Sequence, residues 1–468
     1  MKHPLSRRKF LKTTATGCGM FICGSHFLGC EMENERQLPI DANNPSITLN
    51  RSRCQNCADC ISFCKNQIGV YGRTVPTGEP PCIYCGQCTL YCPRVITERY
   101  HYTEVAEAIA DPAKIVIVST APAIRVALGE MYGLAEGTNV EGKIVASLRA
   151  FGVDDVLDTT FFADLTVMEE ATELLHRLDN AGSPLPMFTS CCPSWVRFAK
   201  LFYPNLLTNL STAKSPIMMQ GALIKTYFAQ QKGIDPTRIV TVALTPCTSK
   251  KAEILLPNMN AAGGQMRDVD FVLTTREIAY LLNDANIDFL QMPDNNVQYS
   301  SLMGVGSGAG MIFGNTGGVM EATLRTAYRI DTGSNPPANF FNLAPARGFD
   351  NVREANVNIG DRSLSVAIVH GTRAARTFLD TIQSGTKQYD FIEVMACSGG
   401  CIGGGGQPVN RSMDANSLRQ QRRNGLFERG DSDEIRVSYD NPQIQSLYND
   451  FLGYPLSAKA IELLHTNH

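Results

Sequence analysis

From about residue 111 onward, short apolar runs alternate with segments whose apolar positions recur at helical spacing. Residues 114–120, 270–274 and 365–369 are predicted strands, because they are short, apolar and rich in β-branched side chains. Predicted helices cover residues 164–177, 215–231 and 276–283, and another helix starts in residues 122–130. This alternation indicates parallel sheet with helices on its faces. Two such sets, before and after about residue 235, predict an α/β domain of two lobes with a crevice between them.

Three further apolar runs share one design, in which a predicted strand delivers cysteine at its carboxyl end. They lead to Cys191 and Cys192, to Cys247, and to Cys397 and Cys401. Ligands of open α/β sheets bind outside the carboxyl ends of the strands, so these cysteines can gather around one crevice. Four thiolates hold a [4Fe-4S] cubane, which leaves one cysteine over. The glycines around Cys401 would let the backbone approach a bulky cofactor, although a glycine-rich loop with buried free cysteines is the alternative.

Ahead of this domain, the cysteines form an internal repeat. Its two runs are Cys54-x2-Cys57-x2-Cys60-x3-Cys64 and Cys82-x2-Cys85-x2-Cys88-x3-Cys92. This is the bacterial ferredoxin spacing, in which the fourth cysteine of each run ligates the other cluster. We therefore expect one [4Fe-4S] cluster on Cys54, Cys57, Cys60 and Cys92, and a second on Cys82, Cys85, Cys88 and Cys64. Zinc is the alternative, but two interleaved runs do not suit tetrahedral zinc sites. Lys65 stands where such a run usually has proline.

Composition and charge narrow the possible functions. The 468 residues are 44% hydrophobic, enough for two to four domains with a sizeable core. A net charge of −3 argues against nucleic acid as the partner. Of the 16 cysteines, those outside the first 30 residues all belong to the ferredoxin-like runs or to the crevice set. No pair is left that indicates a disulfide.

The first 30 residues have the features of a targeting segment. Ser6-Arg-Arg-Lys-Phe-Leu-Lys12 places twin arginines before an apolar pair, and residues 13–29 are moderately apolar. This resembles a twin-arginine export signal, a route for folded proteins, and a chance basic N-terminus is the alternative. Phe27-Leu-Gly-Cys30 loosely resembles a lipoprotein cleavage site, which makes Cys30 a candidate lipid anchor, although Phe27 departs from the usual aliphatic residue. Residues 31–50 are polar and are a predicted linker.

Three segments of the crevice set resemble the signature motifs of [FeFe]-hydrogenases, and they occur in that family's order. They are Thr189-Ser-Cys-Cys-Pro-Ser-Trp195, Pro246-Cys-Thr-Ser-Lys-Lys-Ala-Glu253 and Glu393-Val-Met-Ala-Cys-Ser-Gly-Gly-Cys401. The resemblance runs from about residue 50 to the C-terminus. It implies a small α+β ferredoxin-like domain (51–110), a two-lobed α/β catalytic domain (111–412) and a C-terminal segment (413–468). That segment resembles the small subunit of some periplasmic hydrogenases. Its first part, residues 413–425, is rich in Arg and Gln and is expected to lie on the surface.

The resemblance implies reversible oxidation of H2 at an H-cluster. Three [4Fe-4S] clusters are implied, two of ferredoxin type and one in the H-cluster, with a two-iron subcluster carrying CO, cyanide and a bridging dithiolate. Cys192, Cys247, Cys397 and Cys401 would ligate the H-cluster cubane, and Cys401 would also bridge to the two-iron unit. Electrons would reach a redox protein such as a c-type cytochrome or a ferredoxin. Maturation proteins would insert the cofactor, and the export signal implies the periplasm or the outer face of the cytoplasmic membrane.

The resemblance also assigns a proton relay. Cys191, the leftover thiol, would exchange protons with the bridge amine, with Glu170, Ser211 and Glu173 behind it and Arg177 at the surface end. On pattern alone, Glu170 and Glu173 are more simply a solvated helix face, since residues three apart share a face.

Four further residues would surround the two-iron unit. Lys250 would hydrogen-bond a cyanide and Glu253 would orient its loop, although Lys250 as a surface lysine, or a one-residue slip to Lys251, stays open. Phe313 and Met395 would pack against the unit, and an ordinary core position is the alternative for Met395. The chain departs from the family at Thr245, usually Met, and at Ser398, usually Pro.

Other functions are less well supported by the sequence. The glycine-rich residues 304–318 contain neither G-x-G-x-x-G nor a P-loop, which argues against nucleotide binding. A redox or H2 sensor with an H-cluster and low turnover is the main alternative, but such sensors usually add a signalling domain. An electron carrier or cluster-assembly relative would generally lack the full cysteine set.

Overall fold

The computed structural model describes residues 37–295 and 299–468. The expected export signal, with Cys30, and the first part of the predicted linker lie outside the described residues. Within those ranges, no helix has the length and apolar content to cross a bilayer. The strands are β1 (Ile47–Leu49), β2 (Ile96–Glu98), β3 (Ile115–Thr120), β4 (Asp155–Asp158), β5 (Met187–Phe188), β6 (Ile239–Leu244), β7 (Phe271–Leu273), β8 (Val352–Ile359), β9 (Arg362–His370) and β10 (Phe391–Met395). The helices are α1 (Asp59–Phe63), α2 (Gln87–Tyr91), α3 (Tyr102–Ala110), α4 (Pro122–Arg125), α5 (Glu141–Phe151), α6 (Thr159–Asp179), α7 (Pro193–Phe202), α8 (Pro216–Leu223), α9 (Ala229–Lys232), α10 (Lys250–Glu253), α11 (Thr275–Asp284), α12 (Gly308–Met311), α13 (Gly318–Thr332), α14 (Ala344–Arg347), α15 (Thr372–Gln383), α16 (Ala415–Asp431), α17 (Pro442–Leu447) and α18 (Ala458–Leu464).

The region of the ferredoxin-like cysteines repeats in its backbone as well as in its sequence. Strands β1 and β2 pair antiparallel and join the two ends of the region. Asn56 and Ala58 in the first run, and Tyr84 and Gly86 in the second, all have positive φ. These residues hold the same positions relative to the cysteines, and each pair leads into a short helix, α1 or α2. Both runs therefore curl the backbone in the same way beside their thiols.

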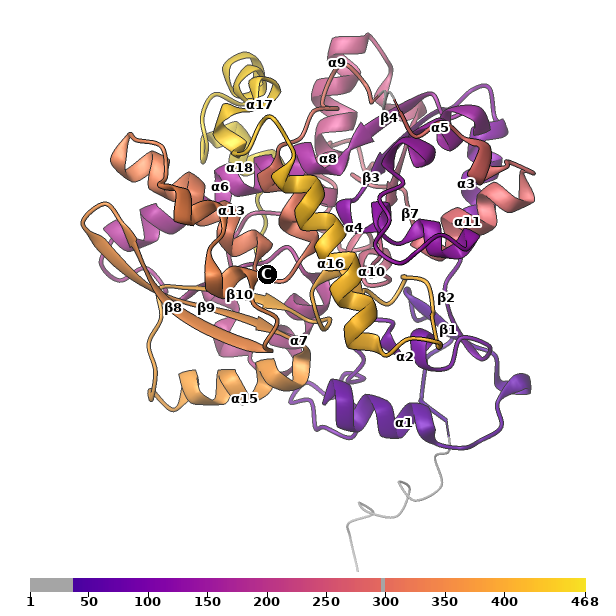
Figure 1. Ribbon diagram of the computed structural model, residues 1–468, viewed down its shortest axis with the longest axis horizontal. Helices are drawn as coiled ribbons and strands as arrows, with labels where there is room; N and C mark the ends of the chain where they lie inside the picture. The colour runs from indigo at the N-terminus through magenta and orange to yellow at the C-terminus, as the bar shows by residue number, and fades with distance from the viewer. Residues whose placement is uncertain (1–36, 296–298) are drawn as a thin grey trace, which may run out of the picture. The chain divides into compact units, whose positions relative to one another are not determined.

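Two larger sheets form the core of the catalytic region (Figure 1). The first has the order β4-β3-β6-β7 and is parallel throughout. The second has the order β5-β10-β9-β8, in which β5, β10 and β9 are parallel. Helices pack on both, so the predicted α/β domain with two lobes of parallel sheet is confirmed.

Two details of the predicted arrangement are wrong. The lobes do not divide at residue 235, because β6 and β7 return to the first sheet after it, whereas β5 precedes it and joins the second. Strand β8 is antiparallel to β9, because only a tight turn at Gly360 connects them and so short a link permits no parallel pair. Periodicity identifies strands, but it does not say which strands become neighbours.

Helix α6 contributes to the cores of both lobes. Its first half, with Phe161 and Leu165, packs in the core that includes β3 and α8, and its second half, with Leu174, packs against β9 and β10. Asp158 caps its N-terminus by accepting a hydrogen bond from the Thr160 N–H at 2.7 Å. Because α6 runs from one core to the other, the carboxylates on its faces are buried.

The C-terminal segment is packed into the molecule. Helix α16 lies at the front of the view in Figure 1, between β10 and α4. The segment 413–425 lies largely at the surface, as expected, with residues 414–417 exposed, but Leu418 and Arg422 are buried and Arg422 forms an ion pair with Glu130 at 2.6 Å. The arginine-rich composition did not indicate the burial of Arg422, because ion pairs let long basic side chains line an interface. Helices α17 and α18 pack on the core of α6 and α8.

Candidate active site

The five crevice cysteines line a single cavity of about 80 Å³. Cys191 and Cys192 follow β5, Cys247 follows β6, and Cys397 and Cys401 follow β10. The cavity thus lies at the carboxyl ends of strands from both sheets, where α/β folds bind ligands.

The surroundings of these thiols suit an iron–sulfur cluster. Backbone N–H groups donate to the sulfurs of Cys192 and Cys247, as is usual for cluster thiolates. Burial raises the pKa of the Cys247 thiol to about 12, so a thiolate there needs a bound metal. Among residues 37–295 and 299–468, no three His, Cys, Asp or Glu side chains converge closely enough to hold one metal ion. Thiols spread around a cavity match a polynuclear cluster, whose ligands lie at separate corners, and the donor set fits that group.

A glycine run at 403–406 brings the ferredoxin-like region against this cavity. A Cβ on Gly405 would collide with the backbone of Cys85 and Gly86. Next to that contact, Gln87 Nε2 donates to Cys397 Sγ at 3.3 Å and to the carbonyl of Gly403 at 2.8 Å. No sequence pattern marked Gln87, because only the cysteine spacing distinguishes this loop. One side chain therefore links the loop of Cys85 to a cysteine of the crevice.

Lys250 is the buried cation of the cavity. Its Nζ donates to the carbonyl of Cys191 at 3.1 Å and to the carboxylate of Glu253 at 2.7 Å. Burial disfavours its charge, but Glu253 and the thiol of Cys247 outweigh that effect and raise the pKa of Lys250. Lys251 instead pairs with Glu277 at 2.9 Å and does not line the cavity. Lys250, and not Lys251, is therefore the lysine that lines the cavity with the cysteines.

The rest of the lining is mostly apolar. Phe313, Met395, Ile217 and Thr245 all contribute to it, and Ser398 does not. Phe313 is 7% exposed and Met395 is 2% exposed. Of the two departures from the family pattern, only Thr245 therefore brings a changed side chain to the cavity.

A line of polar groups leads away from Cys191 along α6. Glu170, which influences Cys191 electrostatically, is 1% exposed. Ser211 lies between the two carboxylates: it hydrogen-bonds Glu170, and its Oγ donates to Glu173 at 2.7 Å. Burial raises the pKa of Glu170 to about 8, with further contributions from the carboxylates of Glu173 and Glu393. Such a carboxyl can hold or release a proton near neutral pH.

The outer end of this line opens into a surface pocket of about 690 Å³. Glu173 and Arg177 line it, together with Thr212 and His465. Arg177 donates to Glu173 at 2.6 Å and is 8% exposed, so it lies in the pocket wall and not on the open surface. His465 comes from the C-terminal segment, and no sequence pattern connected it with α6.

The ferredoxin-like cysteines form two groups. Cys64, Cys82, Cys85 and Cys88 line a cavity of about 450 Å³. Cys54, Cys57 and Cys60 are the electrostatic neighbours of Cys92, and Cys57 is exposed. The group with Cys85 thus lies next to the crevice, and the group with Cys57 lies next to the surface.

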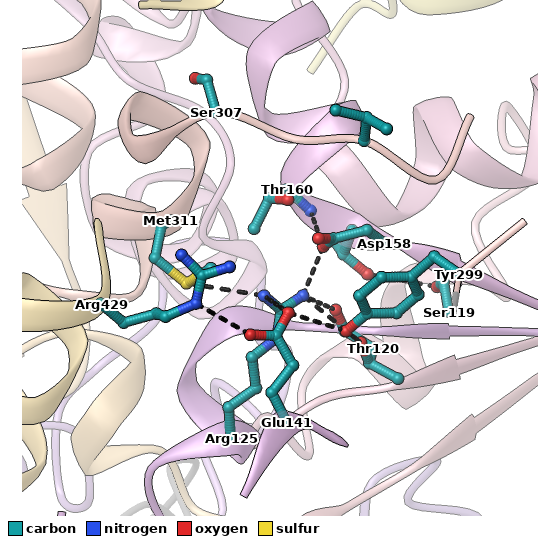
Figure 2. A network of polar contacts seen from close by, with 12 residues as sticks. Ser119, Thr120, Arg125, Glu141, Asp158, Thr160, Tyr299, Ser307, Met311 and Arg429 are labelled. Atoms are coloured by element: carbon teal, nitrogen blue, oxygen red, sulfur yellow. Dashed lines mark hydrogen bonds and ion pairs between the residues drawn. The ribbon is translucent and has the colours of Figure 1, made fainter. Parts of the chain in front are cut away.

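A buried ion network behind the cavity was also missed. Figure 2 shows the Arg125 guanidinium between Glu141, at 2.7 Å, and Asp158. Arg125 is fully buried on α4, directly after the cavity residues 121–123. Arg429 of α16 pairs with the other oxygen of Glu141 at 3.0 Å. The network therefore connects α16 to residues 121–123, which line the cavity.

Comparison with known proteins gives one consistent result. The model of the iron-only hydrogenase large subunit, C-terminal domain, matches residues 114–405, and that of the iron hydrogenase small subunit matches residues 416–468. The NADP-reducing hydrogenase subunit HndD of Solidesulfovibrio fructosivorans is 46% identical over 98% of this chain and 79% of its own. The periplasmic [Fe] hydrogenase large subunit of Nitratidesulfovibrio vulgaris is 42% identical over 78% of this chain and 86% of its own. A solved structure of apo [FeFe]-hydrogenase HydA1 from Chlamydomonas reinhardtii, a single-residue variant, superposes with a TM-score of 0.69 at 39% identity, covering 79% of this chain and 99% of that one.

Proposed function

The chain belongs to the [FeFe]-hydrogenase family, and from this premise we propose how its residues carry out the family's reaction. The protein is an oxidoreductase that interconverts H2 with protons and electrons at an H-cluster, and it carries iron–sulfur clusters. When bound, the two-iron unit with its CO, cyanide and dithiolate supplies the metal centre at which H2 is made and split.

Cys192, Cys247, Cys397 and Cys401 would hold the H-cluster cubane, and Cys401 would also serve the two-iron unit. The observation that carries this proposal is the gathering of thiols from three strand ends around one mostly apolar cavity. The two ferredoxin-like cysteine groups hold one [4Fe-4S] cluster each, which makes three in all. Cys191 lines the same cavity and is left free, since the four-thiolate set is complete without it.

The other lining residues would orient the two-iron unit and exclude water from it. The ammonium of Lys250, whose direction Glu253 fixes, would donate a charge-assisted hydrogen bond to an anionic cyanide ligand. Phe313 and Met395 would pack against the unit and exclude water. Thr245 adds a hydroxyl to this lining and so changes the polarity next to the cluster.

Protons move between the cavity and the surface through Cys191, Glu170, Ser211 and Glu173. The pKa of about 8 at Glu170 and the Ser211 bridge to Glu173 support this assignment. Arg177 holds Glu173 in place at the outer end.

The ferredoxin-like region would carry the electrons between the crevice and the redox partner. The hydrogen bond from Gln87 to Cys397 supports this route, because it joins the loop of Cys85, which would hold one cluster, to a cysteine that would hold the H-cluster cubane. The group that includes the exposed Cys57 then meets the redox partner, a c-type cytochrome or a ferredoxin.

We place this function outside the cytoplasm. The twin-arginine pattern at Arg7-Arg8 supports export of the folded chain to the periplasm or the outer face of the cytoplasmic membrane, with Cys30 as a candidate lipid anchor. The segments are the signal (1–30), the linker (31–50), the ferredoxin-like domain (51–110), the catalytic domain (111–412) and the small-subunit-like segment (413–468). The last is fused here, so no separate small subunit is needed.

Iron content and H2-linked turnover test the proposal together. A sample matured by the family's assembly proteins should contain about fourteen irons per chain, from three cubanes and one two-iron unit. Cys397→Ala should lose about six of them and all H2 turnover, while its ferredoxin-type clusters remain. A matured wild type that stops at about eight irons and lacks turnover contradicts the proposal. Full iron with only trace turnover would identify a sensor.

A further inference from the structure

The end of the chain lies along the loop that carries Ser211. The Thr466 N–H donates to the carbonyl of Thr212 at 2.8 Å, and the Lys214 N–H donates to the carbonyl of Leu464 at 2.8 Å. His468 Nε2 lies 2.9 Å from the carbonyl of Ser211. The C-terminal tail therefore forms a wall around the outer part of the proton relay.

The imidazole of His465 is held at both nitrogens. Nδ1 lies 2.8 Å from Thr212 Oγ1, and Nε2 lies 3.0 Å from a carboxylate oxygen of Glu169. Thr212 is also tied to the relay, because its backbone N–H donates to Glu173 at 3.0 Å. Thr212 thus joins Glu173, the last carboxylate of the relay, to His465 of the tail.

His465 also reaches the pocket at the end of the relay. It lines the pocket of about 690 Å³ that Glu173 and Thr212 line, a volume with room for water. The titratable and charged groups around it are Glu169, Glu173, His176 and Arg177 from α6, Tyr448 after α17, and His468 from the tail. Glu169 accepts hydrogen bonds from Tyr448, from the Leu456 N–H and from His465, so these contacts fix its position beside the ring.

We propose that His465 is the proton-exchange residue between Glu173 and the solvent, and that Thr212 is the hydroxyl that connects them. This inference rests on the proposed hydrogenase function. An imidazole can accept a proton at one ring nitrogen while the other nitrogen donates, so it can pass protons between two hydrogen-bonded neighbours. The C-terminal segment then takes part in proton transfer as well as in packing.

The transfer moves one proton and breaks no other bond. With Nε2–H donated to Glu169, Nδ1 accepts from the Thr212 hydroxyl. During H2 oxidation, the proton of Glu173 reaches the Thr212 oxygen through water in the pocket, and the hydroxyl passes its own proton to Nδ1. The imidazolium then releases that proton to the buffer, and the sequence reverses for H2 formation.

Three variants in the matured full-length chain separate this role from simple anchoring. His465→Gln keeps two hydrogen-bonding groups but cannot carry a proton near neutral pH. Thr212→Val keeps the branched shape and the backbone N–H to Glu173 but lacks the hydroxyl. His176→Ala is the matched control, since His176 is exposed on the same pocket. The first two should slow turnover about tenfold in dilute non-imidazole buffer, less than the about 10² expected for a group next to the reacting centre, and the control should not change it.

Chemical rescue decides between the two roles. Imidazole added to His465→Ala should restore most of the lost turnover and leave the control unchanged. An unchanged rate in His465→Gln and Thr212→Val, or absence of rescue in His465→Ala, would overturn the inference. If wild type itself lacked H2 turnover, the proposed function would fail first.

Discussion

Glu170→Gln replaces the most deeply buried carboxyl of the relay with a neutral side chain of nearly the same shape. Glu170 is 1% exposed. Burial, helped by the carboxylates of Glu173 and Glu393, raises its pKa from 4.5 to about 8. The folded protein therefore keeps a proton on this group at pH values where the unfolded chain has lost it.

The sign and size of the effect follow from this difference. Because the folded state binds the proton more tightly, the contribution of Glu170 to the free energy of unfolding falls as the pH rises from about 4.5 to about 8. At about 1.4 kcal/mol per pH unit, the fall amounts to about 5 kcal/mol over that window. Gln does not titrate, so the variant should become more stable than wild type as the pH rises.

The assay is chemical denaturation of the metal-free protein at pH 5, 6.5 and 8. The midpoint difference between Glu170→Gln and wild type should increase steadily toward pH 8. Glu354→Gln is a matched surface control: hydrogen bonds from Lys387 and Tyr389 lower the pKa of Glu354, so its midpoint difference from wild type should stay nearly constant from pH 5 to pH 8. In the matured protein, Glu170→Gln should also reduce turnover at least about 10²-fold, since Gln cannot carry the proton.

Two results would refute this reasoning. A midpoint difference that is constant from pH 5 to pH 8 would mean that Glu170 is ionised in the folded state. Wild-type turnover in Glu170→Gln would mean that protons do not pass through this carboxyl.

The remaining predictions concern the thiol at the inner end of the proton relay, the electron route and a buried histidine. Cys191→Ser should keep the H-cluster iron but lose at least about 10² in turnover, with partial, pH-dependent recovery in Cys191→Asp; loss of cluster iron would instead make Cys191 a ligand. Cys57→Ser should slow turnover with a protein acceptor far more than isotope exchange between H2 and water, and equal losses would show that electrons bypass the ferredoxin-like region. Burial, with Lys251 nearby, lowers the pKa of His101 to about 4, so its contribution to stability should fall by about 3 kcal/mol as the pH drops from 6.5 to 4. In metal-free His101→Gln that part of the acid loss should disappear, and an identical acid profile would argue against a neutral buried imidazole.

The sequence was most informative where one residue type at fixed spacing defines the chemistry. The cysteine runs predicted which thiols gather in each group, because a cluster needs its ligands at set intervals. The strand ends predicted that Cys192, Cys247 and Cys401 meet, because parallel strands bring their carboxyl ends to one edge.

Contacts between distant segments could not be predicted from the sequence. Gln87 and His465 have no local pattern, since each acts through a partner hundreds of residues away in the chain. The arginines of α16 appeared as a surface composition, because their partners Glu130 and Glu141 lie in another part of the sequence. The antiparallel strand β8 was missed because its alternating polar residues suit an edge strand and a loop alike.

Infrared spectroscopy of the matured protein is the sharpest test of the crevice as an H-cluster site, since bound CO and cyanide absorb where protein groups do not. We expect CO and cyanide bands in wild type and in Cys57→Ser, and none in Cys401→Ser, which lacks the thiolate proposed to serve both the cubane and the two-iron unit. Fully matured wild type without these bands, or Cys401→Ser with the wild-type bands, would contradict the assignment of the crevice as an H-cluster site.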